Sequence, residues 1–286
     1  MHPGFTHPAS RVTSFGKHSR SRQLGAGPSA GQNEPMRWLT RVPCLLADLV
    51  LPGGCCACGA WLTTAEGPWC TECALAMGRA SQQFYCPRCG LTTDEPAGAA
   101  DGCPRCVEHR IAFDGFCRVG EYDGLLRQLI CKFKFGRCQQ LDRPLGRFLA
   151  VAVGTRSWAC EVEAIVPVPL SWRSRLAYRF SPPRALAQEL GRELKLPVLP
   201  LLYEKGKRRR QVGLTADERR QNVHGVFRLA RGARPAGGIF CMVHDVSTTG
   251  ATLQEVARVL KQAGATRVYA AVLAKTNPER AHALQA

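Results

Sequence analysis

The sequence has no apolar run long enough to cross a membrane, and its N-terminal segment lacks the apolar core of a secretory signal. Aromatic residues are scarce, at 7% of the chain. Acidic residues are also few, because 22 Asp and Glu stand against 39 Lys and Arg, which gives a formal net charge of +17. These shortages argue against membrane insertion, secretion and a strand-binding surface of stacked aromatic side chains. We therefore expect a cytoplasmic protein whose partners are anionic, such as phosphorylated ligands or nucleic acid.

Cysteine, in contrast, is abundant, and eight of the 15 cysteines form four C-x-x-C pairs. Two thiolates spaced in this way bind one tetrahedral Zn²⁺, and two such pairs complete a closed site. Pairing in chain order predicts two zinc ions, one on Cys55, Cys58, Cys70 and Cys73 and the other on Cys86, Cys89, Cys103 and Cys106. An interleaved cross-brace is the alternative, and His109 could replace a cysteine of the second site.

The predicted zinc sites are structural rather than catalytic. Four thiolates leave no coordination position for a reactive water, and a module poor in apolar residues needs metal to fold. Gly59 and Gly90 directly follow the first and third pairs, where a knuckle turn favours positive φ. The second pair leads into the segment ALAMGRA, which predicts that this pair opens a helix.

The segment from Gly238 to Gly264 has the pattern of a strand, a loop of small residues and a helix. Ile239–Val243 is an apolar run that fits a buried parallel strand, and from Leu253 apolar residues recur at helical spacing. Between them lies a turn rich in hydroxyl groups, His244–Thr252. The free N–H groups at the start of a helix, with the positive end of its dipole, form an anion pocket.

We assign this predicted pocket to a phosphate group. The residues expected to bind the phosphate are Ser247, Thr248, Thr249, Gly250, Ala251 and Thr252. Asp245 would lie beside the phosphate, where an acid suits sugar hydroxyls or a metal ion better. The alternative is an ordinary strand-to-helix turn in which Thr side chains cap the helix.

The remaining pattern predicts alternating strands and helices. A short apolar segment at 116–122 is followed by helices near 125–134 and 141–151, a strand at 164–168, a helix at 183–194 and a last strand at 268–273. This order is typical of an α/β fold with a parallel sheet, flanking helices and a ligand at the strand ends. We divide the chain into a disordered tail at 1–35, a short helix and double zinc module at 36–110, and an α/β domain at 111–286.

Two basic features add to the anionic-partner hypothesis. Lys207, Arg208, Arg209 and Arg210 form a dense run that predicts a polyanion site, here assigned to single-stranded DNA. The helix near 125–134 carries Arg127, Lys132 and Lys134 on one face, which either contact phosphates or form a solvated surface.

Several motifs together carry a resemblance to a known family. HDVSTTGATL, at 244–253, resembles the phosphoribosyl-pyrophosphate (PRPP) loop of type I phosphoribosyltransferases. The chain also contains Y-x-G-x-L-x-x-L-I-x-x-x-K at Tyr122–Lys134, V-P-V-P-L at Val166–Leu170 and R-x-Q-x-x-L-T-x-x-E-R-x-x-N at Arg209–Asn222. With the cysteine module, these motifs resemble the ComF family of phosphoribosyltransferase-like competence proteins across residues 38–275.

The resemblance implies a type I phosphoribosyltransferase fold that binds PRPP with Mg²⁺, and a cytosolic role in handling transforming single-stranded DNA beside a competence helicase. It places Asp245 and His244 at the catalytic ribose position, and assigns Arg173, Arg175 and Arg179 to pyrophosphate. A proline-shaped loop with solvated arginines is the alternative for the last three.

The chain departs from the family pattern in two places. Arg179–Pro183 reads R-F-S-P-P where the family has R-G-F-N-Q, and His244 stands where the family has the first of two acids. No residue is an evident base for an acceptor, so turnover as a phosphoribosyltransferase stays open. The rival hypotheses are a metabolic phosphoribosyltransferase acting on a small nitrogen nucleophile and a non-catalytic single-stranded-DNA binder that reuses the phosphate loop.

Overall fold

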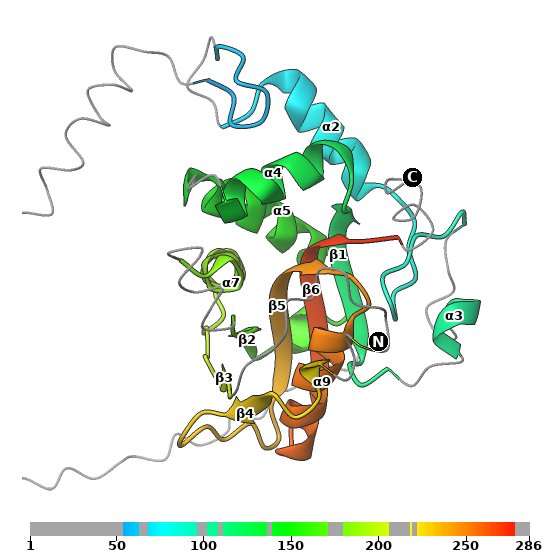
Figure 1. Cartoon of the computed structure of the whole chain (residues 1–286), viewed down its shortest axis with the longest axis vertical. Helices are drawn as coiled ribbons and strands as arrows, with labels where there is room; N and C mark the ends of the chain where they lie inside the picture. Colours follow the sequence, from blue (N-terminus) through cyan, green and yellow to red (C-terminus); the bar gives the residue numbers. More distant parts are fainter. Residues whose placement is uncertain are drawn as a thin grey trace, which may run out of the picture. The chain divides into compact units, whose positions relative to one another are not determined.

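Four parallel strands form the centre of the molecule (Figure 1). They are β1 (Gly115–Glu121), β2 (Ala164–Pro167), β5 (Ile239–Ser247) and β6 (Arg267–Lys275), in the spatial order β1-β6-β5-β2. Nearly every residue of these strands is buried, as expected for a sheet covered on both faces. The predicted parallel α/β class is confirmed.

The computed structural model of the chain describes residues 54–62, 68–95, 102–107, 111–135, 139–170, 180–205, 218 and 222–277. All of them belong to one unit, Asp48–Ala286, and the other unit is Met1–Ala47. The predicted tail at 1–35 and the predicted helix at 38–51 lie outside the described residues, and the domain boundaries stay a prediction.

Four amphipathic helices cover the sheet. They are α4 (Gly124–Phe135), α5 (Asp142–Gly154), α7 (Pro182–Leu194) and α9 (Ala251–Gln262), each within three residues of its predicted bounds at either end. Their apolar residues recur at helical spacing, and α4 for example buries Leu126, Leu129, Ile130 and Phe133. Two short 3₁₀ turns, Gln139–Leu141 and Ala159–Glu161, join helices to the chain that follows.

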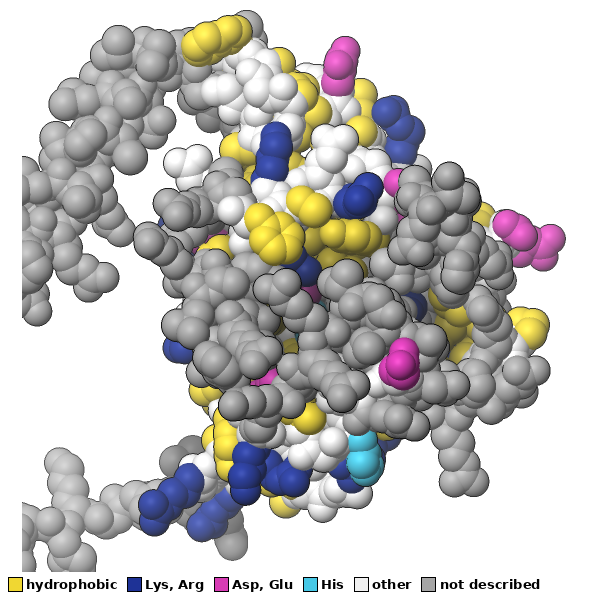
Figure 2. Space-filling model, viewed as in Figure 1, with side chains coloured by type: hydrophobic (Ala, Val, Ile, Leu, Met, Phe, Trp, Pro, Cys, Tyr) yellow, Lys and Arg dark blue, Asp and Glu magenta, His cyan; other side chains and the backbone are white. Residues whose placement is uncertain are grey.

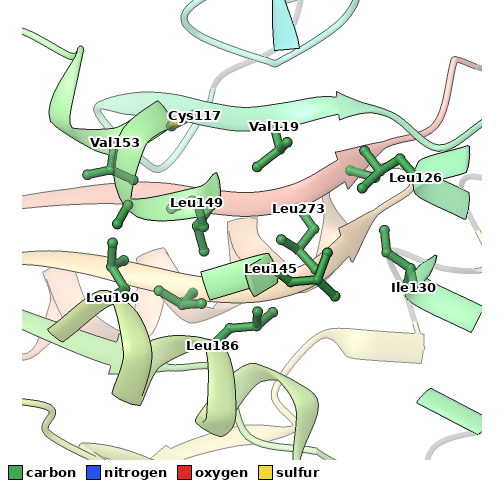
Figure 3. Close-up of a cluster of buried hydrophobic side chains, with 14 of the residues drawn as sticks. Cys117, Val119, Leu126, Ile130, Leu145, Leu149, Val153, Leu186, Leu190 and Leu273 are labelled. Atoms are coloured by element: carbon green, nitrogen blue, oxygen red, sulfur yellow. The ribbon is translucent and has the colours of Figure 1, made fainter. Parts of the chain in front are cut away.

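The two faces of the sheet carry different cores. Alternate strand residues such as Cys241 and Val243 pack beneath α4, α5 and α7, whereas Phe240 and Met242 pack on the side of α9. Figure 3 shows the first core, where Leu145, Leu149 and Val153 of α5 lie beside Leu186 and Leu190 of α7. The result is a three-layer arrangement in which the carboxyl ends of all four strands share one edge.

A second, two-stranded antiparallel sheet pairs β3 (Leu202–Glu204) with β4 (Phe227–Leu229). The sequence pattern did not predict it, because three residues are too few to establish an alternation. Exposed Lys and Arg side chains gather at the end of the molecule where β4 lies, as Figure 2 shows. The described members of this group are Lys205, Arg228, Arg231 and Arg234.

The cysteine-rich segments pack on the sheet and on α4. Helix α2 (Thr71–Ser81) directly follows Cys70, as predicted, and buries Met77 in the same core as α4 and α5. Helix α3 (Pro104–Val107) begins directly after Cys103 and contains Cys106, the last cysteine of the second group. Gly59 and Gly90 have φ of 80° and 77°, which confirms the prediction for both knuckle turns.

The predicted turn at His244–Thr252 is shorter than expected. His244–Ser247 continue strand β5, and Ala251 and Thr252 already belong to α9, which leaves Thr248–Gly250 as the loop. The reason is the central position of β5, because its backbone keeps pairing with β6 up to the register pair Ser247 and Lys275. In a central strand, therefore, polar side chains do not mark the point where the strand stops.

Candidate phosphate pocket and cysteine sites

A pocket of about 260 Å³ opens at the carboxyl edge of the sheet, between the end of β5 and the start of α9. Its lining comprises Tyr122, Lys134, every residue from His244 to Leu253, and Thr276. All six residues predicted to bind phosphate are therefore brought together, with His244 and Asp245 at the same pocket.

The start of α9 presents backbone N–H donors at this pocket. The N-cap residue is Gly250, with φ of 82°, and it makes no side-chain capping bond. Because the first N–H groups of a helix have no partner inside the helix, they are available to an anion. The rival prediction, Thr side chains as caps, has one candidate bond among the described residues, from the Ala251 N–H to Thr249 Oγ1 at a long 3.4 Å.

Ser247 adds a hydroxyl group that has no partner among the described residues. The residue is 4% exposed, and its Oγ atom is buried without a hydrogen bond. A buried hydroxyl group left unpaired costs free energy, so its presence at a pocket favours a ligand oxygen as the missing partner.

The neighbouring strand holds the loop in place. Lys275, at the end of β6, donates from Nζ to the Thr248 carbonyl, and the Thr276 N–H donates to the Ser247 carbonyl over 3.0 Å. The loop backbone is therefore tied to the end of β6, which holds its donors in one arrangement.

Asp245 is the acid of the pocket, and it is paired on two sides. Its Oδ2 lies 2.9 Å from Lys134 Nζ of α4, and its Oδ1 accepts a hydrogen bond from the Val246 N–H at 2.6 Å. The side chain is 3% exposed. Burial by itself would raise the pKa of Asp245, but Lys134 and His244 outweigh it and hold the pKa well below its usual value. Asp245 is thus an ionised carboxylate inside an ion pair.

His244 lies against the same carboxylate. Its Nδ1 is 2.6 Å from Asp245 Oδ1 and 2.8 Å from the backbone nitrogen of Asp245. The Asp245 N–H donates to a lone pair on Nδ1, whereas a proton on Nδ1 would instead donate to Oδ1. In either arrangement His244 lies against Asp245 and adds no negative charge to the pocket.

The pocket is a poor fit for a protein-bound divalent metal ion. Asp245 is the single carboxylate among the described residues that line it, and Lys134 occupies that carboxylate. Mg²⁺ takes oxygen ligands and is usually held by one or two carboxylates together with substrate phosphates. The hydroxyl groups and N–H groups of the loop fit a phosphate well, but the acidic half of the pocket does not fit Mg²⁺.

The eight predicted zinc ligands come together in two groups of four. In each group the sulfur atoms all lie within 4.8 Å of one another. The groups are Cys55, Cys58, Cys70 and Cys73, and Cys86, Cys89, Cys103 and Cys106, so the chain-order assignment is confirmed over the cross-brace. His109 lies outside the described residues.

Both groups are compatible with structural zinc. Backbone N–H groups point at the sulfur atoms, from Cys70 to Cys55 Sγ and from Cys103 to Cys86 Sγ, each at 3.3 Å. Hydrogen bonds from the Cys89 thiol and from nearby backbone N–H groups lower the pKa of Cys86 to about 4. A thiolate is the form that binds metal, and within this group the surroundings favour it at Cys86, whereas the contact with Cys86 raises the pKa of Cys89.

Two predicted clusters cannot be placed. Arg173, Arg175 and Arg179, and the run Lys207, Arg208, Arg209 and Arg210, lie outside the described residues. The pocket also contains Lys134, which was predicted only as one of three cations on a helix face and not as a residue of the pocket. A signal for it was present, because Lys134 is the final residue of the motif at Tyr122–Lys134.

Among the described residues, no helix is both long and apolar enough to span a bilayer.

A parallel α/β sheet with a hydroxyl-rich pocket at its carboxyl edge, preceded by two four-cysteine groups, defines the class of this protein. No family model matches the chain. The chain is 32% identical to competence protein F of Haemophilus influenzae over 217 residues, which is 73% of this chain and 91% of that protein. It is 29% identical to DNA utilization protein YhgH of Salmonella typhimurium over 233 residues, covering 80% and 99% of the two chains. The chain therefore belongs to the competence protein F family, as the motifs predicted.

Solved structures show a looser likeness. Glutamine PRPP amidotransferase from B. subtilis matches with 17% identity and a TM-score of 0.31, covering 49% of this chain and 30% of that one. Adenine phosphoribosyltransferase from Leishmania donovani matches with 14% identity and a TM-score of 0.31, covering 54% and 60%. The family assignment rests on the curated relatives.

Proposed function

We propose that the protein binds PRPP or a related phosphoribose in this pocket, and that it serves the handling of single-stranded DNA in competence or DNA utilization. One observation carries the proposal, which is the unpartnered, buried Ser247 hydroxyl beside the uncapped start of α9. The two features converge on a site for a tetrahedral anion. The family membership supports the DNA-related role.

In this proposal the 5′-phosphate accepts hydrogen bonds from the loop at Thr248–Gly250, from the first N–H groups of α9 and from Ser247. The ribose hydroxyls face Asp245 and His244, where a carboxylate can accept a hydrogen bond from a hydroxyl group. Arg173, Arg175 and Arg179 stay predicted pyrophosphate contacts. The Mg²⁺ expected with PRPP would enter as its complex with the pyrophosphate, because the described lining offers it no unpaired carboxylate.

The proposal concerns binding and assigns no acceptor nucleophile. Phosphoribosyl transfer requires stabilisation of a cationic ribose as pyrophosphate leaves. The negative charge of Asp245 is already neutralised by Lys134, at 2.9 Å. Such a pair stabilises a developing cation less than a free carboxylate would, so the geometry supports ligand binding more strongly than turnover.

Two structural zinc ions complete the proposal, one in each four-cysteine group. Elemental analysis of the purified protein should find about two zinc ions per chain, since each group supplies a closed set of four thiolates. A value near one would show that one group holds no metal.

Calorimetry with PRPP and Mg²⁺ tests the pocket. Ser247→Ala and Thr249→Ala should each weaken binding by about tenfold or more, the effect of one lost hydrogen bond to a charged group. Ser157→Ala is the matched control, because Ser157 is exposed and lies away from the lining. An absence of PRPP binding by the unmodified protein would contradict the proposed function.

The single-stranded-DNA role has its own support in the exposed cations near β3 and β4. Lys205, Arg228, Arg231 and Arg234 are exposed, and Lys205 directly precedes the segment that carries the predicted run at 207–210. Affinity for an oligonucleotide should fall steeply as salt rises, because bound phosphates release counterions. Replacement of Lys207–Arg210 by alanine should weaken binding and flatten the salt slope. An unchanged slope would remove that run from the interface.

A further inference from the structure

In this pocket a lysine pairs with the carboxylate that a site for a divalent metal ion would leave available to the metal. The single described carboxylate of the lining, Asp245, faces the ammonium group of Lys134 at 2.9 Å. Its other oxygen is taken by His244 and by the Val246 N–H. Both oxygens of the carboxylate thus have partners supplied by the protein.

Packing holds Lys134 in place, so it is not a freely moving surface side chain. Its side chain is only 16% exposed, and its neighbour Phe133 is fully buried. The Phe133 ring meets the Phe180 ring edge-to-face, with centroids 5.2 Å apart. This contact and the apolar face of α4 fix the end of the helix, so the Lys134 stem emerges from an ordered backbone.

We propose that Lys134 is the built-in cation of the phosphate pocket, and that it lets a phosphomonoester bind without a divalent metal ion. This inference rests on the proposed function. Lys134 is a positioning residue and it neutralises Asp245, so that the loop and its hydroxyl groups face a dianionic phosphate without a repelling carboxylate beside them. The preferred ligands are therefore sugar 5-phosphates and other phosphomonoesters that carry no metal.

The charges at the pocket explain why a single lysine suffices. Asp245 contributes one negative charge and Lys134 one positive charge, and His244 adds no negative charge. Without Lys134, a phosphate dianion would approach an uncompensated carboxylate in a partly buried site, where charge repulsion is weakly screened. A divalent ion would then be needed between the two anions.

The test is calorimetry with ribose 5-phosphate, performed once with Mg²⁺ and once with EDTA. The unmodified protein should bind equally in both, within about twofold. Lys134→Met should bind about tenfold or more weakly in EDTA, through the loss of a charged partner, and should recover part of that affinity with Mg²⁺. Arg143→Met is the charge-matched control, because Arg143 is exposed on α5 and does not line the pocket.

Two further variants keep the test valid if Lys134→Met folds poorly. Lys134→Arg retains the cation and should keep binding that is independent of Mg²⁺. Lys134→Met combined with Asp245→Asn removes both charges, so it should fold and bind without a response to Mg²⁺. Circular dichroism reports the fold of each variant.

The outcomes separate this inference from the proposed function. Binding by the unmodified protein only when Mg²⁺ is present would overturn the role of Lys134 and leave phosphoribose binding intact. Unweakened binding of ribose 5-phosphate by Lys134→Met in EDTA would also overturn it. No binding of ribose 5-phosphate or PRPP in either condition would defeat the proposed function itself, and the inference with it.

Discussion

The two four-cysteine groups share one sequence pattern but differ in how the protein surrounds them. In the first group Cys58 is exposed and Cys70 is half-buried, whereas in the second group Cys86, Cys103 and Cys106 are all buried. The first group joins the core of the main domain through Cys55, Ala57 and Cys73. Lys132 of α4 also donates to the carbonyls of Cys56 and Ala57. The second knuckle is built into the sheet.

That second knuckle covers the edge strand β1. The Phe116 N–H donates to the Pro87 carbonyl at 2.7 Å, and the Arg118 N–H donates to the Tyr85 hydroxyl at 3.3 Å. The outward N–H groups of an edge strand are otherwise open to pairing with another chain. The same C-x-x-C pairs therefore stand in two settings. The first group joins the core beneath α4 and α5, and the second covers the edge strand of the sheet.

The largest expected effect comes from removing one ligand from each group. Cys86→Ser should lower the free energy of unfolding by about 4 kcal/mol or more, because it loses a zinc ion and exposes the edge of β1. Cys58→Ser should cost about half as much, since Cys58 is the exposed ligand of its group. Zinc content should drop to about one ion per chain in both variants, and thermal unfolding measures the difference. Equal destabilisation would remove the distinction between the sites.

A matched pair of glycine substitutions sharpens the comparison. Both Gly59 and Gly90 have positive φ, so alanine costs about 1 kcal/mol of backbone strain at either position. A Cβ at Gly90 would lie 2.2 Å from the Phe116 ring, whereas a Cβ at Gly59 meets nothing within 4 Å. Gly90→Ala should therefore cost about 3 kcal/mol in total. Urea unfolding of the two variants gives the comparison, and similar midpoints would mean that Phe116 can move aside.

A smaller effect is expected from Thr92, which links the second knuckle to β1. Its hydroxyl accepts from Arg118 Nη2 at 2.8 Å and donates to Glu121. Arg118 is 2% exposed, so Thr92→Val leaves a buried cation short of one partner, at a cost of about 2 kcal/mol. Thr155→Val, at an exposed hydroxyl, should stay within about 0.5 kcal/mol. A neutral result for Thr92→Val would mean that Arg118 finds another acceptor.

The smallest effect should come from the contact that holds the first knuckle. Lys132→Met removes the donor to the Cys56 and Ala57 carbonyls and should cost about 1 kcal/mol. It should also speed the transfer of one zinc ion to a competing chelator, followed with a colorimetric zinc indicator. Arg127→Met, on the exposed side of the same helix, is the control and should leave that rate unchanged. Faster release of both zinc ions would show that the two knuckles are coupled.

The phosphate loop shows how far local pattern carries. The hydroxyl groups, the strand before them and the helix after them were all predicted, because each depends on short-range spacing. The predicted end of the strand was wrong, because the polar residues His244–Ser247 were predicted to form a turn. Their pairing with β6 extends the strand, and a pairing partner elsewhere in the chain leaves no trace in the local pattern.

The sequence by itself determined which cysteines group together, the order of the strands and helices of the main sheet, and the position of the loop between β5 and α9. These features follow from spacing over a few residues, where thiol geometry and hydrophobic period act directly. Only the tertiary structure decided that the second knuckle covers β1 and that Lys134 of α4 meets Asp245 of β5. Both contacts depend on the order of strands in the sheet and on which helix covers which face, and that order arises from the packing of the whole chain.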